Sequence, residues 1–166
     1  MKKLLLLLFL AVAGTGIAQE INRDYYIEQI NQGIQYKDYE KAALNLTALQ
    51  HSFPLDDQTR FLEAAVTYFT TINNIKYREY LTIRGLINYM DQEVEYFKNT
   101  DRADRVLFMS TMLKFSISYY QGFKKNLSAA ELKDLENEVY KDARELKGNV
   151  EGFETEIDRM IQTLNY

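Results

Sequence analysis

Apolar residues recur at spacings of three and four along most of the chain after residue 22, which is the pattern of amphipathic α-helices. The same part of the chain contains one proline, Pro54, and few glycines to interrupt a helix. No stretch rich in serine, proline or glycine separates one part from another. We therefore expect a single all-α domain over residues 19–166, folded as an antiparallel bundle of five to six helices.

The first two helices are predicted to form a hairpin. One helix covers about residues 23–36 behind an Asn22 cap, and the second begins after Asp38. The second helix ends near Phe53, because a residue that precedes a proline is pushed out of helical geometry. The apolar positions of this hairpin are Tyr26, Ile27, Ile30, Ile34, Tyr39, Ala42, Ala43, Leu46 and Leu49.

Three further helices are predicted over about residues 56–72, 76–98 and 101–125. Asn73 and Asn74 interrupt the apolar pattern between the first two of them. The third is apolar on more than one face. Such a helix belongs at the centre of a bundle or beneath a partner.

The last helix has the best-marked start in the chain. Ser128 and Glu131 match a capping box, and Leu127 and Leu132 match the hydrophobic staple that accompanies it. From there an apolar stripe continues to the end of the chain in steps of three and four. Its members are Leu132, Leu135, Val139, Ala143, Leu146, Val150, Phe153, Ile157, Met160 and Leu164.

The continuity of this stripe favours one long C-terminal helix. Gly148 and Gly152 lie off the stripe, and each lowers helix propensity by about 1 kcal/mol relative to alanine, so a break between them is the alternative. A helix of this length would project past a compact domain. Its apolar end would then be exposed and would meet a partner or a second copy of the chain.

The hairpin carries a few residues of a repeat family: Tyr26 in the first helix, Asp38 and Tyr39 at the turn, Ala42 and Leu46 in the second helix, and Pro54 at the close. On these positions residues 23–56 resemble one degenerate tetratricopeptide repeat. The resemblance implies a short helical array with a surface that binds peptides or proteins.

The hairpin also departs from the repeat pattern. Ile30 occupies the position of the small residue that lets the two helices of that family pack closely. The next window keeps Ala64 but needs an insertion before Lys76 to recover the pattern. A generic helical hairpin accounts for the matching residues equally well, because one repeat cannot bury its own apolar face.

The N-terminus reads as a secretory signal peptide over residues 1–18. Lys2 and Lys3 are followed by an apolar run from Leu4 to Ala13 and then by small residues up to Ala18. Cleavage there would make Gln19 the first residue of an exported protein in the periplasm or outside the cell. An uncleaved membrane anchor is the alternative, but the run of about ten apolar residues is short of the ~20 that span a bilayer.

The composition excludes several kinds of chemistry and makes some partners unfavourable. The chain has no cysteine, which excludes disulfides, thiolate catalysis and a lipid anchor on an N-terminal cysteine. Its net charge is −4 and becomes more negative when Lys2 and Lys3 are removed, so nucleic acid and anionic membrane surfaces are poor partners. No later stretch is apolar enough for a membrane span.

No catalytic, cofactor-binding or metal-binding residues are predicted. His51 is the only histidine, so a zinc site would lack ligands, and its place at a helix end suits a partner for the helix dipole better than a haem ligand. Ser52 beside it has no nucleophile elbow around it. A run of acids, Glu131, Asp134, Glu138, Asp142 and Glu145, shares one helical face. We interpret it as a solvated face, with a docking face for a basic partner or weak calcium binding as alternatives.

The unusual feature of the composition is its 13 tyrosines. Tyrosine suits the boundary between core and solvent, and it is also enriched at protein interfaces. The candidate interaction surface therefore combines paired tyrosines with the apolar end of the chain: Tyr25, Tyr26, Tyr77, Tyr80, Tyr119, Tyr120, Val150, Phe153, Ile157 and Leu164. We expect an exported, non-enzymatic protein that acts in protein–protein interaction, self-association or assembly. The alternative is a small-ligand carrier or enzyme with a pocket inside the bundle.

Overall fold

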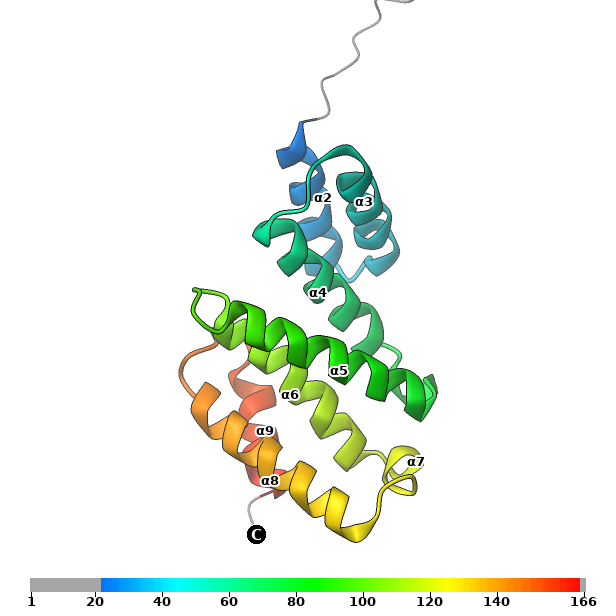
Figure 1. Ribbon diagram of the computed structural model, residues 1–166, viewed down its shortest axis with the longest axis vertical. Helices are drawn as coiled ribbons and strands as arrows, with labels where there is room; N and C mark the ends of the chain where they lie inside the picture. Colours follow the sequence, from blue (N-terminus) through cyan, green and yellow to red (C-terminus); the bar gives the residue numbers. More distant parts are fainter. Residues whose placement is uncertain (1–21, 165–166) are drawn as a thin grey trace, which may run out of the picture. The chain divides into compact units, whose positions relative to one another are not determined.

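The computed structural model describes residues 22–164, and every regular element in that range is helical (Figure 1), which confirms the all-α prediction. The helices form two compact units, one that ends at Pro54 and one that begins at Leu55. One domain over residues 19–166 stays a prediction. The predicted signal peptide and its cleavage site before Gln19 lie outside the described residues.

The first unit is the predicted helical hairpin, made of α2 (Arg23–Gln35) and α3 (Tyr39–Ser52). Both helices begin at the caps expected from the sequence. Asn22 Oδ1 accepts a hydrogen bond from the Tyr25 amide at 3.0 Å, and Asp38 Oδ1 accepts one from the Lys41 amide at 3.1 Å. The buried apolar side chains between the helices are Ile27, Ile30, Ala42, Leu46 and Leu49.

Gly33 sets how closely the two helices of this hairpin approach. A Cβ atom at Gly33 would lie 2.9 Å from the Ala42 Cβ and 2.9 Å from the Asp38 carbonyl oxygen, so no larger residue fits without a shift. In the repeat family the small residue that allows close packing would stand at position 30, and in this hairpin Gly33 has that role instead. Ile30, fully buried, fills the core instead.

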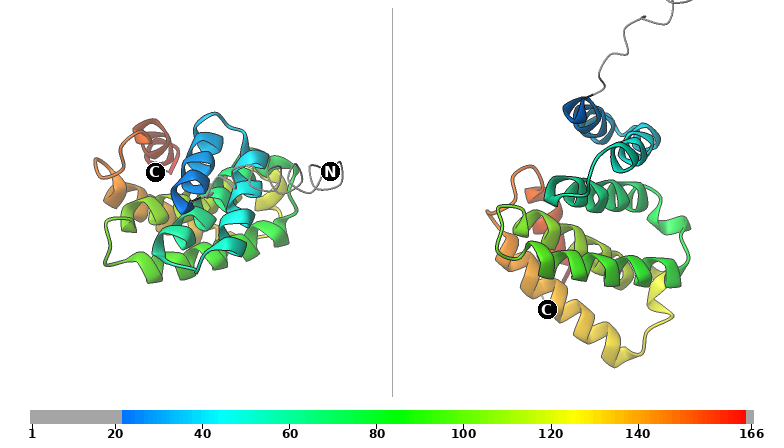
Figure 2. Two further views of the ribbon diagram at one scale, coloured as in Figure 1. Left: turned by 90° about the horizontal axis from the view of Figure 1, so that it is seen from above. Right: turned by 45° about the horizontal axis from the view of Figure 1, so that its top comes forward.

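The second unit contains α4 (Asp57–Ile72), a 3₁₀ turn η1 (Ile75–Tyr77), α5 (Tyr80–Phe97), α6 (Ala103–Tyr119), α7 (Gln121–Lys124), α8 (Ala129–Leu146) and α9 (Glu154–Leu164). The central helix is α6, which packs against α4, α5, α7 and α8 (Figure 2). Its buried side chains point in several directions and include Val106, Phe108, Leu113, Phe115 and Ile117. The prediction of a central helix here is confirmed.

The central helix is shorter than predicted. It ends at Tyr119, because Tyr120 adopts an extended conformation with φ −79° and ψ 126°. The rest of the predicted segment forms the separate short turn α7, whose Phe123 is buried. This extended residue turns the chain at the point where the aromatic pair Tyr119 and Tyr120 lies.

The capping box at the start of α8 is present as predicted. Ser128 Oγ accepts a hydrogen bond from the Glu131 amide at 3.2 Å, and Glu131 Oε2 accepts one from the Ser128 amide at 2.8 Å. Hydrogen bonding of the Glu131 carboxylate with the side chain and then the backbone amide of Ser128 stabilises its charged form and lowers the pKa of Glu131.

The long C-terminal helix predicted from the stripe is wrong. Helix α8 ends at Leu146, and the chain turns back through Gly148 (φ +86°) and Gly152 (φ +85°) before α9 packs against α8. Both angles lie in the left-handed region, which glycine adopts without steric cost. The stripe is continuous in sequence because two antiparallel helices bury their apolar faces in the same core.

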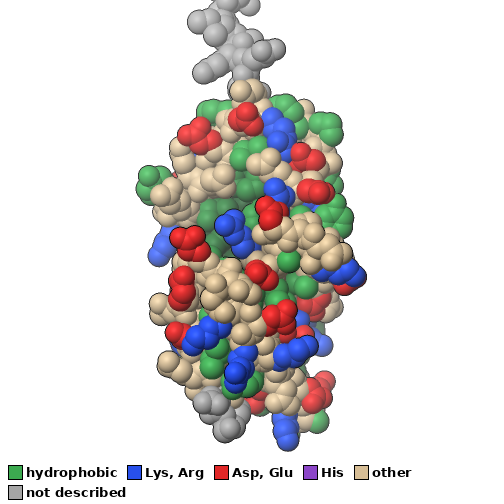
Figure 3. Space-filling view, turned by 90° about the vertical axis from the view of Figure 1, so that its left-hand side faces the viewer, with side chains coloured by type: hydrophobic (Ala, Val, Ile, Leu, Met, Phe, Trp, Pro, Cys, Tyr) green, Lys and Arg blue, Asp and Glu red, His purple; other side chains and the backbone are tan. Residues whose placement is uncertain are grey.

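The surface of the described part of the chain mixes charges of both signs. On the face drawn in Figure 3, acidic and basic side chains are interspersed among small hydrophobic groups. Within residues 22–164, no helix combines the length and apolar character that crossing a membrane requires.

Candidate functional site

A pocket of about 90 Å³ lies in the second unit beside the C-terminal ends of α4 and α6. Helix α4 and the turn η1 contribute one isoleucine each, α6 contributes four residues, Tyr120 follows α6 directly, and α9 contributes a single cation. The lining residues are Ile72, Ile75, Met112, Phe115, Ser116, Tyr119, Tyr120 and Arg159. The pocket is therefore mostly apolar and aromatic, with one charged group.

The aromatic wall is built by helical spacing. Phe115 and Tyr119 lie four residues apart on α6, so they share a face, and their rings stack with centroids 5.4 Å apart. Tyr120 meets Tyr119 edge to face, also at 5.4 Å. Tyr119 is 40% exposed although it lines the pocket, so part of this ring is open to solvent.

Arg159 lies over the face of the Tyr119 ring. Its Cζ atom is 5.0 Å from the ring centroid, within the range of a cation–π contact. Among residues 22–164 the structure gives Arg159 no carboxylate partner; the adjacent acid, Asp158, pairs instead with Lys147 at 2.8 Å. The guanidinium therefore keeps its hydrogen-bond donors available beside an apolar pocket.

The volume of the pocket limits what it can hold. Sites for cofactors and drug-sized ligands usually enclose about 300–1,000 Å³. A volume of about 90 Å³ is well below that range and suits a single side chain of another molecule.

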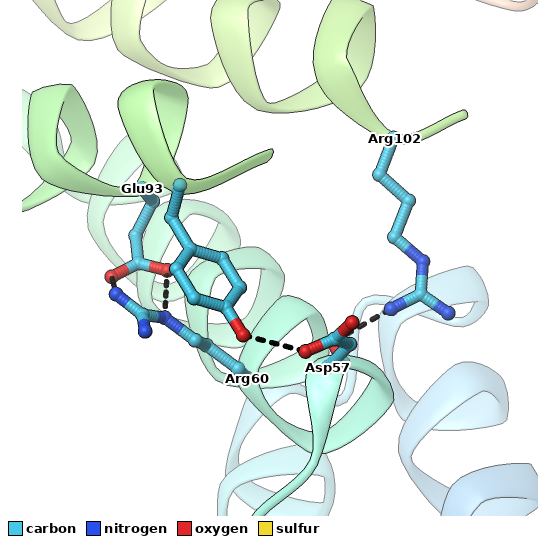
Figure 4. Close-up of polar contacts among 5 residues, drawn as sticks. Asp57, Arg60, Glu93 and Arg102 are labelled. Atoms are coloured by element: carbon cyan, nitrogen blue, oxygen red, sulfur yellow. Dashed lines mark hydrogen bonds and ion pairs between the residues drawn. The ribbon is translucent and has the colours of Figure 1, made fainter. Parts of the chain in front are cut away.

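Outside the pocket, a cluster of hydrogen-bonded polar side chains joins α4 to α5 (Figure 4). Arg60 donates to both carboxylate oxygens of Glu93, at 2.6 and 2.8 Å, and its guanidinium lies 3.6 Å from the centroid of the Tyr96 ring. The Tyr96 hydroxyl donates to Asp57 Oδ1 at 2.6 Å, and Arg102 donates to the Asp57 carbonyl oxygen at 2.6 Å. Because these groups bond to one another, we interpret the cluster as a structural brace.

A buried lysine joins α5, α6 and α8. Lys114 on α6 is 2.8 Å from Asp91 and 2.7 Å from Glu138, and its side chain is 8% exposed. Burial lowers the pKa of Lys114, but its hydrogen bonds to the two carboxylates outweigh that effect and the pKa lies above its ordinary value. A lysine held charged in this way is no nucleophile at neutral pH, so this cluster is also structural.

The structure places Tyr119 and Tyr120 of the predicted surface together in the pocket. Tyr77, which is 76% exposed, follows the pocket residue Ile75 by two positions, and Tyr80 begins α5. Tyr25 and Tyr26 belong to the first unit, where their rings meet edge to face at 5.7 Å.

The apolar end of the predicted surface needs correction. Val150, Ile157 and Leu164 are buried, with 3%, 1% and 6% of their surfaces exposed. Phe153 packs against Phe108 of α6 with ring centroids 4.4 Å apart. These residues complete the core of their own chain, because α9 folds back along α8.

Six pocket residues were not predicted as site residues: Ile72, Ile75, Met112, Phe115, Ser116 and Arg159. Ile75 follows the Asn73-Asn74 interruption, where an apolar residue inside a polar turn was the available signal. Arg159 lies between the stripe members Ile157 and Met160, and nothing local distinguishes it from other surface cations. Long-range packing brings Ile75 and Arg159 to Tyr119.

Metal chemistry finds no support in the described residues. Over residues 22–164 no group of three or more His, Asp or Glu side chains is placed to hold a metal ion. His51 is exposed in the last turn of α3, where an imidazole faces the negative end of the helix dipole.

Comparisons with known proteins give no match: no family model, no curated protein and no solved structure matches this chain.

Proposed function

We propose that this chain is an exported, non-enzymatic protein that binds another protein through the Tyr119 pocket. The observation that carries the proposal is the pairing of Tyr119, 40% exposed, with an Arg159 that has no carboxylate partner in the described chain. Tyrosine and arginine are, with tryptophan, the residues enriched at the energetic centres of protein interfaces. Beside them lies an apolar pocket of side-chain size.

The pocket volume bears on the rival function, a small-ligand carrier or enzyme. A pocket of about 90 Å³ is too small to enclose a typical metabolite or cofactor, whereas interface pockets commonly receive one anchoring side chain. The polar clusters around Arg60 and Lys114 bond internally, and neither offers a free acid, base or nucleophile. Binding therefore explains more of the molecule than catalysis does.

Site-specific photo-crosslinking in the producing cell tests the binding site. A benzophenone amino acid at Tyr119 should give a discrete crosslinked adduct with one protein. The matched control is the same substitution at Tyr36, which is 75% exposed in the first unit and lies outside the pocket. The same adduct from both positions, or none from Tyr119, would contradict the proposal.

Export is tested separately by the mass of the protein recovered from the periplasm or the medium. The expected N-terminus is Gln19 or its pyroglutamate form, because the leader pattern places cleavage after Ala18. A full-length, membrane-bound product would overturn export while leaving the binding proposal standing.

A further inference from the structure

We propose, resting on the function proposed above, that the Tyr119 pocket receives an aliphatic side chain of a protein partner and that Arg159 binds an acidic side chain next to it. The partner would thus present leucine, isoleucine or valine beside aspartate or glutamate. Four features support this choice: the size of the pocket, the state of the guanidinium, the charge of the neighbouring segments and the elements that line the pocket.

The size and the lining of the pocket favour one kind of partner side chain. Ile72, Ile75 and Met112 make the pocket apolar, and its volume is about 90 Å³. A dry cavity of roughly 150 Å³ holds a benzene ring. In a pocket of little more than half that volume, a branched aliphatic side chain, the smaller of the two kinds of apolar anchor, leaves less of itself outside than an aromatic ring does.

The guanidinium of Arg159 favours an acidic side chain next to the partner residue that enters the pocket. The Arg159 Cζ atom lies 5.0 Å over the Tyr119 ring, and within residues 22–164 no acceptor takes a hydrogen bond from the N–H groups of this guanidinium. A carboxylate accepts two such donors side by side, and this geometry is the strongest that arginine offers to an anion. Asp158 does not fill this role because it pairs with Lys147.

Charge near the pocket agrees with an acidic partner although the chain is acidic overall. Residues 72–78 include Lys76 and Arg78, with Glu79 directly after them, and residues 115–125 include Lys125 and Lys124, the latter paired with Glu136 at 3.7 Å. These two segments contribute most of the pocket lining. Basic segments in a chain of net charge −4 favour encounter with an acidic segment.

The lining elements favour a side-chain carboxylate over a chain terminus. Terminal carboxylates are usually captured by nests of backbone N–H groups. Ile72 is the last residue of α4 and Tyr119 is the last residue of α6, and helix ends of this kind present carbonyl oxygens. Arg159 is then the donor for the carboxylate, and an acidic side chain can reach it from a partner's surface.

Synthetic peptides test the inference by NMR titration of the folded protein. The probe is a short helical peptide, blocked at both ends, with leucine and glutamate one turn apart. Its variants replace the glutamate by lysine, replace the leucine by alanine, or lack acids and end in leucine with a free carboxylate. The leucine–glutamate peptide should shift the signals of the Arg159 Nε–H and the Tyr119 amide, and the lysine peptide should bind at least roughly tenfold more weakly.

Charge exchange gives the decisive control, because Arg159 is exposed and its replacement leaves the core intact. Arg159→Glu should reverse the preference, so that the lysine peptide binds more tightly than the glutamate peptide. Equal binding of the two peptides, or tightest binding of the peptide with the free carboxylate, overturns the inference. A crosslink from Tyr119 that survives Arg159→Gln unchanged would support the proposed function and overturn this inference alone.

Discussion

Arg60 donates two hydrogen bonds to Glu93, from Nε at 2.6 Å and from Nη2 at 2.8 Å, and thereby joins α4 to α5 (Figure 4). The Glu93 side chain is only 4% exposed, while that of Arg60 is 32% exposed. A carboxylate removed from water to this degree is tolerated because the guanidinium matches both of its oxygens. The pair therefore fixes which turns of the two helices meet.

We predict that Glu93→Gln destabilises the protein by about 1–3 kcal/mol, because the change leaves the arginine without its counter-charge and places an amide N–H₂ against its donors. Urea unfolding followed by circular dichroism measures the effect. The matched control is Glu95→Gln on the same helix, whose ion pair with Lys98 is exposed and should matter by no more than about 0.5 kcal/mol. Equal effects of the two substitutions would mean that the buried pair has no special weight.

Gly33 and Gly85 should respond oppositely to alanine. At Gly33 the added methyl group would overlap Ala42 and the Asp38 carbonyl, so the α2–α3 hairpin must open and stability should fall by about 1–3 kcal/mol. At Gly85, within α5, nothing lies within 4 Å of the new Cβ, and the change should stabilise the protein by about 0.5–1 kcal/mol. Thermal unfolding of both variants measures this. A tolerated Gly33→Ala would show that the hairpin packs less closely than described.

Charged Lys114 should stabilise the folded protein, and this stabilisation should disappear at alkaline pH. Its pKa is raised on folding, so its contribution is fully present below the ordinary value of 10.5 and is lost as the pH rises through the higher folded-state pKa. Lys114→Met should cost about 1–2 kcal/mol at neutral pH, since the partner carboxylates are about half exposed.

The test for Lys114 compares urea unfolding of the parent and the variant from pH 7 to pH 11.5. The difference between them should shrink above pH 10.5, which separates this lysine from the ionisation of the tyrosines common to both proteins. Lys147→Met is the control, because its single ion pair with Asp158 is exposed and should contribute less than about 0.5 kcal/mol. A difference that stays constant with pH would contradict the assignment.

Several helix starts could be predicted because their signals are local. Asn22, Asp38 and Ser128 each accept a backbone hydrogen bond from within the next three residues, so the sequence alone contains the whole interaction. The central position of α6 was also predictable, since a helix that is apolar on several faces has few other places to go.

The break between α8 and α9 could not be resolved from periodicity. Leu146 and Ile157 face the same core from two antiparallel helices, and their spacing along the sequence resembles that of a single helix. The two glycines were visible, but their propensity cost of about 1 kcal/mol each is small beside the burial of several apolar side chains. The choice between the two outcomes depended on tertiary packing.

Only a small part of the candidate site could be predicted from the sequence, for a related reason. The tyrosine content identified Tyr119 and Tyr120, but Ile75 and Arg159 reach them from segments more than 35 residues away in either direction. Contacts of that separation are set by how α4, α6 and α9 pack. One sequence without that packing gives no reason to select Arg159 over any other exposed cation.

The C-terminal segment should prove essential for folding of the second unit. Truncation after Lys147 removes Val150, Ile157, Met160 and Leu164, all of them buried, together with the Phe153 ring that packs on Phe108. Loss of a single buried isoleucine, leucine or methionine side chain typically costs about 2–5 kcal/mol, and a whole domain is stable by about 5–15 kcal/mol. The truncated protein should therefore lose its cooperative unfolding transition and much of its helical circular dichroism.

A synthetic peptide of residues 148–166 added in trans should restore part of both signals, because it supplies the missing face of the core. The full-length variant Gln162→Ala, altered at an exposed position of α9, is the control and should unfold like the parent. A truncated protein that keeps the parent's helicity and unfolding midpoint would mean that α9 is dispensable, and the apolar end of the chain would again be a candidate for binding a partner.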